Sequence, residues 1–135
     1  MPRSHAVTIQ GANQDLIAKG AVDAIARYFT PDYVAHLTDR DLPGGHAGIR
    51  RFLDMLRSSF PDLSVEVEIL VEAKDRVAWQ RTLRGKHTGE FMGFPATGRR
   101  VVWRDMITSR FRDGLIAEEW AVSDLAERLL LARKP

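Results

Sequence analysis

The 135-residue chain contains no cysteine. This absence excludes disulfide bonds, thiolate metal sites and cysteine nucleophiles. Long apolar runs are also missing, since no segment approaches the roughly 20 apolar residues that a membrane-spanning helix needs. Residues 1–10 lack the apolar stretch of a signal peptide. We therefore expect a cytoplasmic protein that has no membrane partner.

The chain also lacks a large excess of charge of either sign. Twenty basic residues stand against eighteen acidic ones, which leaves a net charge of +2. The densest basic pairs, Arg50-Arg51 and Arg99-Arg100, are too short for the basic stripe that is typical of nucleic-acid-binding proteins. The four histidines show no His-x-x-x-His spacing and no carboxylate cluster within one element. We expect neither a nucleic-acid partner nor a bound metal.

The first half of the chain predicts helices. A helix over about residues 4–19 would end at Gly20, and a second helix would end before Pro31. A third helix is expected between Gly44-Gly45 and Pro61. Apolar residues recur with helical spacing in the last two of these stretches: Val22, Ile25, Ala26 and Phe29, and then Ile49, Phe52, Leu53, Leu56 and Phe60.

The second half predicts strands. Apolar and polar residues alternate over residues 65–71, and further strands are expected over 76–86, 101–112 and 115–122, before a last helix that reaches Leu131. Helices followed by an antiparallel meander predict an α+β fold, in which the helices pack on one face of a curved antiparallel sheet. Such a fold encloses a pocket for a small molecule. The length fits a single domain over residues 1–135.

One segment of the second half is distinctive. Residues 85–101 have the sequence GKHTGEFMGFPATGRRV, which resembles the hallmark loop of the SnoaL-like polyketide cyclase family, within the nuclear transport factor 2-like superfamily. The resemblance extends over about residues 11–124. Other matching stretches are residues 28–29, 31–34 and 36, 60–63, 111–116, 118–120 and 124.

The resemblance implies a cone-shaped barrel around a pocket, with no metal and no organic cofactor. Characterised cyclases of this family close a ring by an intramolecular aldol reaction on a polyketide ester. The superfamily also includes isomerases, dehydratases, epoxide hydrolases and non-catalytic binding proteins. An aldol closure needs only a base, a donor to the enolate oxygen and a pocket that folds the substrate for attack.

Asp105 and Glu119 are the candidate acid–base pair. Asp105 lies in mid-strand on the same face as Trp103 and Ile107, so it is either a pocket carboxylate or a surface carboxylate paired with an arginine of a neighbouring strand. The resemblance implies an acid–base aspartate near Glu119 in the last strand, where this chain has a glutamate. Asp124 is the rival acid there, although it also suits the N-cap of the last helix.

Two histidines are further candidates. The resemblance places His36 at the pocket, where it would assist catalysis, with a structural role as the alternative. His87 opens the hallmark loop and fits a structural or lid role. We expect His87, Trp79, Trp103, Phe91 and Met55 to line the pocket, although core packing is the alternative for each apolar side chain.

Arg81 shares a face with Trp79 and Leu83, which makes it either a pocket cation or an exposed residue of the sheet. An epoxide hydrolase of this superfamily would need an arginine, an aspartate partner and a second aspartate in the pocket. The sequence does not assemble that trio.

The sequence thus predicts a cofactor-free enzyme that performs aldol-type cyclisation or isomerisation on an apolar, polyketide-like ligand. The alternative is a non-catalytic protein that binds an apolar ligand. A homodimer is also expected, because the strands have apolar residues on more than one face. The residues behind this expectation are Val65, Val67, Ile69, Val71, Val102 and Met106.

Overall fold

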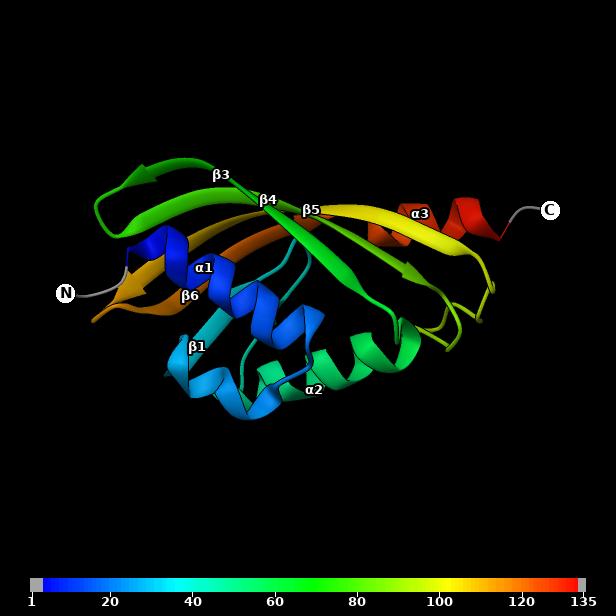
Figure 1. The fold of residues 1–135 in the computed structure, drawn as a ribbon, viewed down its shortest axis with the longest axis horizontal. Coiled ribbons are helices and arrows are strands. Elements are labelled where there is room, and N and C mark those ends of the chain that lie inside the picture. The colour runs from blue at the N-terminus through cyan, green and yellow to red at the C-terminus, as the bar shows by residue number, and fades with distance from the viewer. Residues whose placement is uncertain (1–3, 134–135) are drawn as a thin grey trace.

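The computed structural model describes residues 4–133 of the chain (Figure 1). Three α-helices, two shorter helical segments and six strands follow one another along it. In order they are α1 (His5–Ala12), the π-helical η1 (Asn13–Ala18), the 3-10 helix η2 (Val22–Arg27), β1 (Phe29–His36), β2 (Asp41–Leu42), α2 (Gly45–Ser59), β3 (Ser64–Ala73), β4 (Arg76–Lys86), β5 (Arg100–Arg112), β6 (Leu115–Ser123) and α3 (Leu125–Ala132).

The strands form one curved sheet in the order β2-β1-β6-β5-β4-β3, with α1 and α2 beneath it (Figure 1). This arrangement confirms the predicted α+β class. The sheet is mixed rather than wholly antiparallel, because β1 runs parallel to β6 while every other neighbouring pair is antiparallel. Since β2 and β3 are its two edges, the sheet curls without closing into a barrel.

The predicted helices are largely present. α1 and η1 together form the first one, and Gly20 ends it with a φ of +71°, a left-handed conformation that glycine adopts readily. The second is shorter than expected, because Phe29 already belongs to β1 and Pro31 lies within that strand. None of the helices within residues 4–133 has the length and apolarity needed to cross a membrane.

The sheet has an inner face toward α1 and α2 and an outer face away from them. The inner face and the helices enclose a single core, which includes Ile9, Leu56, Trp79, Trp103 and Phe111.

A shift of register between Ile69 and Val71 interrupts the alternation in β3. Val65, Val67 and Ile69 pack against the core, whereas Val71 is exposed. The alternation predicted over residues 65–71, which would put Val71 on the same face as Ile69, is therefore wrong at Val71, because the register shift turns it outward.

Candidate active site

A cavity of about 480 Å³ lies between the inner face of the sheet and the helices. Its volume is in the range of pockets that bind small molecules. Most of its wall is apolar. Prominent wall residues are Leu16 and Ile17 from η1, Phe52, Leu53 and Leu56 from α2, Trp79 from β4, and Trp103 and Ile107 from β5.

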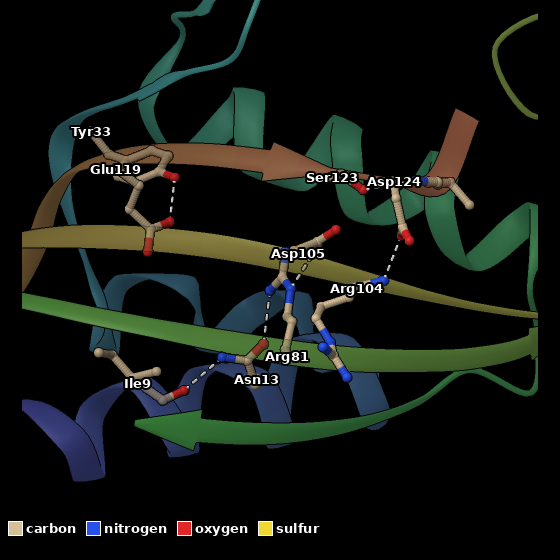
Figure 2. Close-up of polar contacts among 10 residues, drawn as sticks. Ile9, Asn13, Tyr33, Arg81, Arg104, Asp105, Glu119, Ser123 and Asp124 are labelled. Atoms are coloured by element: carbon tan, nitrogen blue, oxygen red, sulfur yellow. Dashed lines mark hydrogen bonds and ion pairs between the residues drawn. The ribbon is translucent and has the colours of Figure 1, made fainter. Parts of the chain in front are cut away.

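Two polar clusters lie at this apolar wall, and Figure 2 shows Tyr33 and Glu119 of the first and all three residues of the second. We call them the glutamate cluster (Tyr33, Trp79, Ser109 and Glu119) and the arginine cluster (Asn13, Arg81 and Asp105). Their members come from five separate elements, so that only the folded chain brings them together.

The glutamate cluster is a chain of hydrogen bonds. The indole N–H of Trp79 donates to Ser109 Oγ at 2.9 Å, and Ser109 donates to Glu119 Oε2 at 2.5 Å. Tyr33 donates to Glu119 Oε1 at 2.6 Å. An indole N–H can only donate, so Ser109 uses its own proton on Glu119. Each oxygen of Glu119 is thus hydrogen-bonded to a hydroxyl group, Oε1 to Tyr33 and Oε2 to Ser109.

Burial raises the pKa of Glu119 above its ordinary value, because the charged carboxylate loses its water. The hydroxyl groups of Ser109 and Tyr33 and the charge of Arg81 oppose this rise without cancelling it. Burial, followed by the negative charge of Glu119, raises the pKa of Tyr33 well above its usual range. The pKa of Glu119 is thus higher than that of an ordinary carboxyl group, and the neighbouring Tyr33 stays a neutral phenol.

The arginine cluster surrounds one guanidinium group (Figure 2). Arg81 Nε donates to Asp105 Oδ2 at 2.9 Å, and Arg81 Nη1 donates to Asn13 Oδ1 at 2.8 Å. Asp105 is only 8% exposed, and its Oδ1 atom is buried without a hydrogen-bond partner among the described residues. Asp105 lines the cavity and also pairs with Arg81 of the neighbouring strand.

Among the predicted residues, Asp105, Glu119, Trp79, Trp103 and Phe91 all line the cavity. Glu119 rather than Asp124 is the acid of this region that faces the cavity. Asp124 accepts from the backbone N–H of Arg104 at 2.8 Å and from Arg128 at 3.2 Å. It occupies the N-cap position of α3, but its side chain makes no capping hydrogen bond there.

His36 is not part of this site, and the expectation that it assists at the pocket is wrong. Tyr33 and Ala35 of β1 face the cavity, so strand alternation turns His36 to the outer face. There it bonds Asp41 at 2.7 Å and Glu118 at 2.5 Å and stacks on Trp120. These two acidic partners, Glu118 first, raise the pKa of His36.

His87 and Met55 were expected to line the pocket and do not. His87 is fully buried behind Phe60, and its Nδ1 accepts from the backbone N–H of Thr97 at 3.2 Å. It therefore holds the base of the loop over residues 87–99, which fits the structural role considered above. Met55 is 37% exposed and is not among the α2 residues that line the cavity, which include Phe52 and Leu53.

Three site residues went unassigned in the sequence: Asn13, Tyr33 and Ser109. Asn13 is 4% exposed and follows the apolar Ile9 and Ala12 on one helix, which is an unusual place for an amide side chain. Tyr33 belongs to a stretch that matches the family, but only the pairing of β1 with β6 brings it to Glu119. Within residues 4–133, no three histidine or acidic side chains lie close enough to one another to hold a metal ion.

A curved sheet packed over helices around an apolar cavity defines the nuclear transport factor 2-like class. Within that class, the family model described as SnoaL-like polyketide cyclase matches residues 7–130. The chain therefore belongs to the SnoaL-like polyketide cyclase family. No protein with a curated description matches it in sequence.

Solved structures agree with this assignment. The chain is similar to wild-type IdmH of Streptomyces antibioticus, a proposed polyketide cyclase, with 31% identity over 96% of this chain and 98% of that one, and a TM-score of 0.80. It is also similar to a proposed SnoaL-like polyketide cyclase of Jannaschia sp. CCS1, with 25% identity over 100% and 99% of the two chains and a TM-score of 0.85. AclR of Streptomyces galilaeus, a proposed hydroxylase, shares 30% identity over 98% and 89%, with a TM-score of 0.77.

Proposed function

We propose that this protein is a cofactor-independent enzyme that performs acid–base chemistry beside a carbonyl group of an apolar, polyketide-like substrate. The reaction class is aldol-type ring closure or the related isomerisation. The observation that carries the proposal is Glu119, a carboxyl group at the wall of an apolar cavity with a pKa that burial raises. A cytoplasmic location and a homodimer belong to the same proposal.

In this proposal, Glu119 as a carboxylate takes a proton from the carbon next to the substrate carbonyl. The C–H bond breaks and an enolate forms. The enolate carbon attacks a second carbonyl of the same molecule, which forms the new C–C bond and leaves an alkoxide. Protonated Glu119 returns its proton to that oxygen, so no atom is gained or lost over the cycle.

The environment of Glu119 suits both halves of this cycle. A raised pKa makes the carboxylate a stronger base and extends the protonated form to higher pH than in an ordinary carboxyl group. Tyr33 donates to Oε1 of the carboxylate, and the same hydrogen bond can reverse when Oε1 carries the proton. Tyr33 can thereby stabilise both protonation states of Glu119.

The test replaces Glu119 with glutamine and measures turnover of a β-keto ester. We expect Glu119→Gln to lower kcat by about a hundredfold or more, the usual contribution of a positioned acid or base. The matched control is Glu118→Gln, because Glu118 is adjacent on β6 but bonds His36 and Arg110 on the outer face. In the native protein, kcat should rise with pH through an apparent pKa above that of an ordinary carboxyl group.

Equal turnover by the native protein and Glu119→Gln would exclude Glu119 as the base. The second candidate function, a non-catalytic protein for an apolar ligand, is favoured by the largely aliphatic and aromatic wall of the cavity. It predicts that native mass spectrometry finds a retained small molecule while no β-keto ester is turned over.

A further inference from the structure

Arg81 places a positive charge at the wall of an apolar cavity. Its side chain is 15% exposed and lines the cavity between Trp79 and Leu83, with the guanidinium carbon 5.5 Å from the Trp79 ring. A buried charge is costly unless it is paired and hydrogen-bonded. The pair with Asp105 and the bond to Asn13 supply part of that compensation.

The guanidinium group has hydrogen-bond donors left over. Of its five N–H groups, Nε–H is used on Asp105 and one Nη1–H is used on Asn13. Nη2 makes no hydrogen bond to any residue within 4–133, and it is not among the buried unpartnered atoms, so it stays accessible from the cavity. An accessible guanidinium N–H pair in an apolar cavity is a site for an oxygen acceptor.

Asn13 holds this arrangement in one orientation. Its Nδ2 donates to the backbone carbonyl of Ile9 at 2.9 Å, which leaves Oδ1 directed at Arg81. Asn13 is the first residue of the π-helical segment η1, a type of local irregularity that is frequent at functional sites. With Asp105 on the other side, Asn13 fixes the guanidinium from two elements.

We infer that Arg81 binds the carbonyl oxygen of the ligand through Nη2, with Asn13 and Asp105 as positioning residues. Because Asp105 already neutralises Arg81, the site suits a neutral ketone or ester whose oxygen gains negative charge only as an enolate forms. Arg81 also contributes to the pKa of both Tyr33 and Glu119, so its charge acts on the glutamate cluster. The inference rests on the proposed function and names the group that recognises the substrate carbonyl.

The test measures binding and needs no turnover. The two ligands are 2-acetylnaphthalene, which has a carbonyl, and 2-isopropylnaphthalene, a hydrocarbon of similar shape. Quenching of tryptophan fluorescence gives both dissociation constants, because Trp79 and Trp103 line the cavity. The quantity compared is the affinity for the ketone divided by the affinity for the hydrocarbon.

Arg81→Met alone leaves Asp105 as an unpaired buried charge, so the main variant combines Arg81→Met with Asp105→Asn. We expect the affinity ratio to fall by at least about tenfold in this double variant, because hydrogen bonds to charged groups are the stronger ones. The matched control is Arg84→Met, since Arg84 is on the same strand but bonds Glu66 and is partly exposed. Its ratio should equal that of the native protein.

Asn13→Leu separates positioning from simple stability. A positioning role predicts that this variant loses affinity for the ketone and keeps its affinity for the hydrocarbon. A purely structural role predicts that the variant loses affinity for both ligands to the same extent.

An unchanged ratio in a double variant that still binds the hydrocarbon would overturn the inference, as would a native protein that binds neither ligand. A lowered ratio without any turnover of β-keto esters would leave the Arg81 site in place and remove the catalytic proposal. If turnover depends on Glu119 but the affinity ratio is unchanged in the double variant, the catalytic proposal stands and the Arg81 site is excluded.

Discussion

At the scale of single residues, Glu118 and Glu119 show how the face of a strand decides the chemistry of a side chain. Glu118 points to the outer face, where the hydrogen bonds of His36 and then Arg110 lower its pKa. Glu119 points to the inner face, where burial raises its pKa. Two adjacent residues of one type are thereby suited to opposite roles, a permanent anion and a proton carrier.

This difference predicts how Glu119→Gln changes stability with pH. The folded chain keeps the Glu119 proton at pH values where the unfolded chain, with a pKa near 4.5, has lost it. The native protein therefore loses stability as pH rises from about 4.5 to the raised pKa, by about 1.4 kcal/mol for each pH unit between the two pKa values. Glu119→Gln removes this loss, so its advantage over the native protein should grow with pH in urea unfolding from pH 4 to 7.

Glu118→Gln supplies the opposite control. The pKa of Glu118 is lowered in the fold, so its contribution to stability is present at neutral pH and is lost as pH falls. This variant should be less stable than the native protein at pH 7 and approach it in acid. Stability curves of Glu119→Gln and the native protein that stay parallel across this range would contradict the raised pKa of Glu119.

At the scale of elements, Gly45 sets how closely α2 approaches β1. Its φ of +52° is left-handed, and a Cβ at this position would overlap the carbonyl oxygen of Pro31. α2 carries Ile49, Phe52 and Leu56 of the cavity wall. The close approach at Gly45 therefore helps to determine the width of the cavity.

Gly45→Ala should destabilise the fold by several kcal/mol, because it combines an unfavourable φ with a clash against backbone. Gly114→Ala is the matched control, since Gly114 has a φ of +80° with nothing near its would-be Cβ. It should cost only about 1 kcal/mol. Thermal unfolding of the two variants measures the difference in stability. Equal losses of stability would show that the backbone at Pro31 moves aside at little cost.

Elements that pair with their neighbours in sequence follow from the pattern of residues alone. β4 and β5 alternate regularly, and this alternation puts Asp105 on the same face as Trp103 and Ile107, as the sequence predicts. Local signals suffice there, because each strand of a hairpin carries its own period of two.

The remainder of the site depends on contacts that no local pattern contains. β1 pairs with β6 across most of the chain, so the contact between Tyr33 and Glu119 and the outward direction of His36 both follow from that pairing. The bond from Arg81 to Asn13 similarly joins a strand to a distant helical segment. No distinctive residue in the sequence predicts the register shift after Ile69.

At the scale of the whole molecule, the outer face of the sheet exposes several apolar side chains. Its exposed apolar side chains are Leu70, Val71, Val102, Met106 and Val122. A shallow hollow at Trp120 is lined in part by Leu70, Met106 and Val122. An apolar surface of this kind is typical of an interface, and a second copy of the chain is the simplest partner.

In the proposed homodimer, Met106→Lys should shift the equilibrium toward the monomer, because a lysine at this exposed apolar position would be buried at the interface. Sedimentation velocity at micromolar concentration measures the change. Val7→Lys is the control, since Val7 is exposed on α1, away from the sheet. A native protein that sediments only as a 15.2 kDa species would contradict the predicted dimer.

The parallel pairing of β1 with β6 also decides when the cavity can exist during synthesis. β1 leaves the ribosome early, yet its partner strand begins only at Leu115. Until then one side of β1 has no strand to pair with, and Tyr33 has no carboxylate to bond. Pairings between such distant residues form slowly, and unpaired strand edges promote association with other chains. The nascent chain thus passes most of its synthesis with the future cavity open, and the last hairpin closes it.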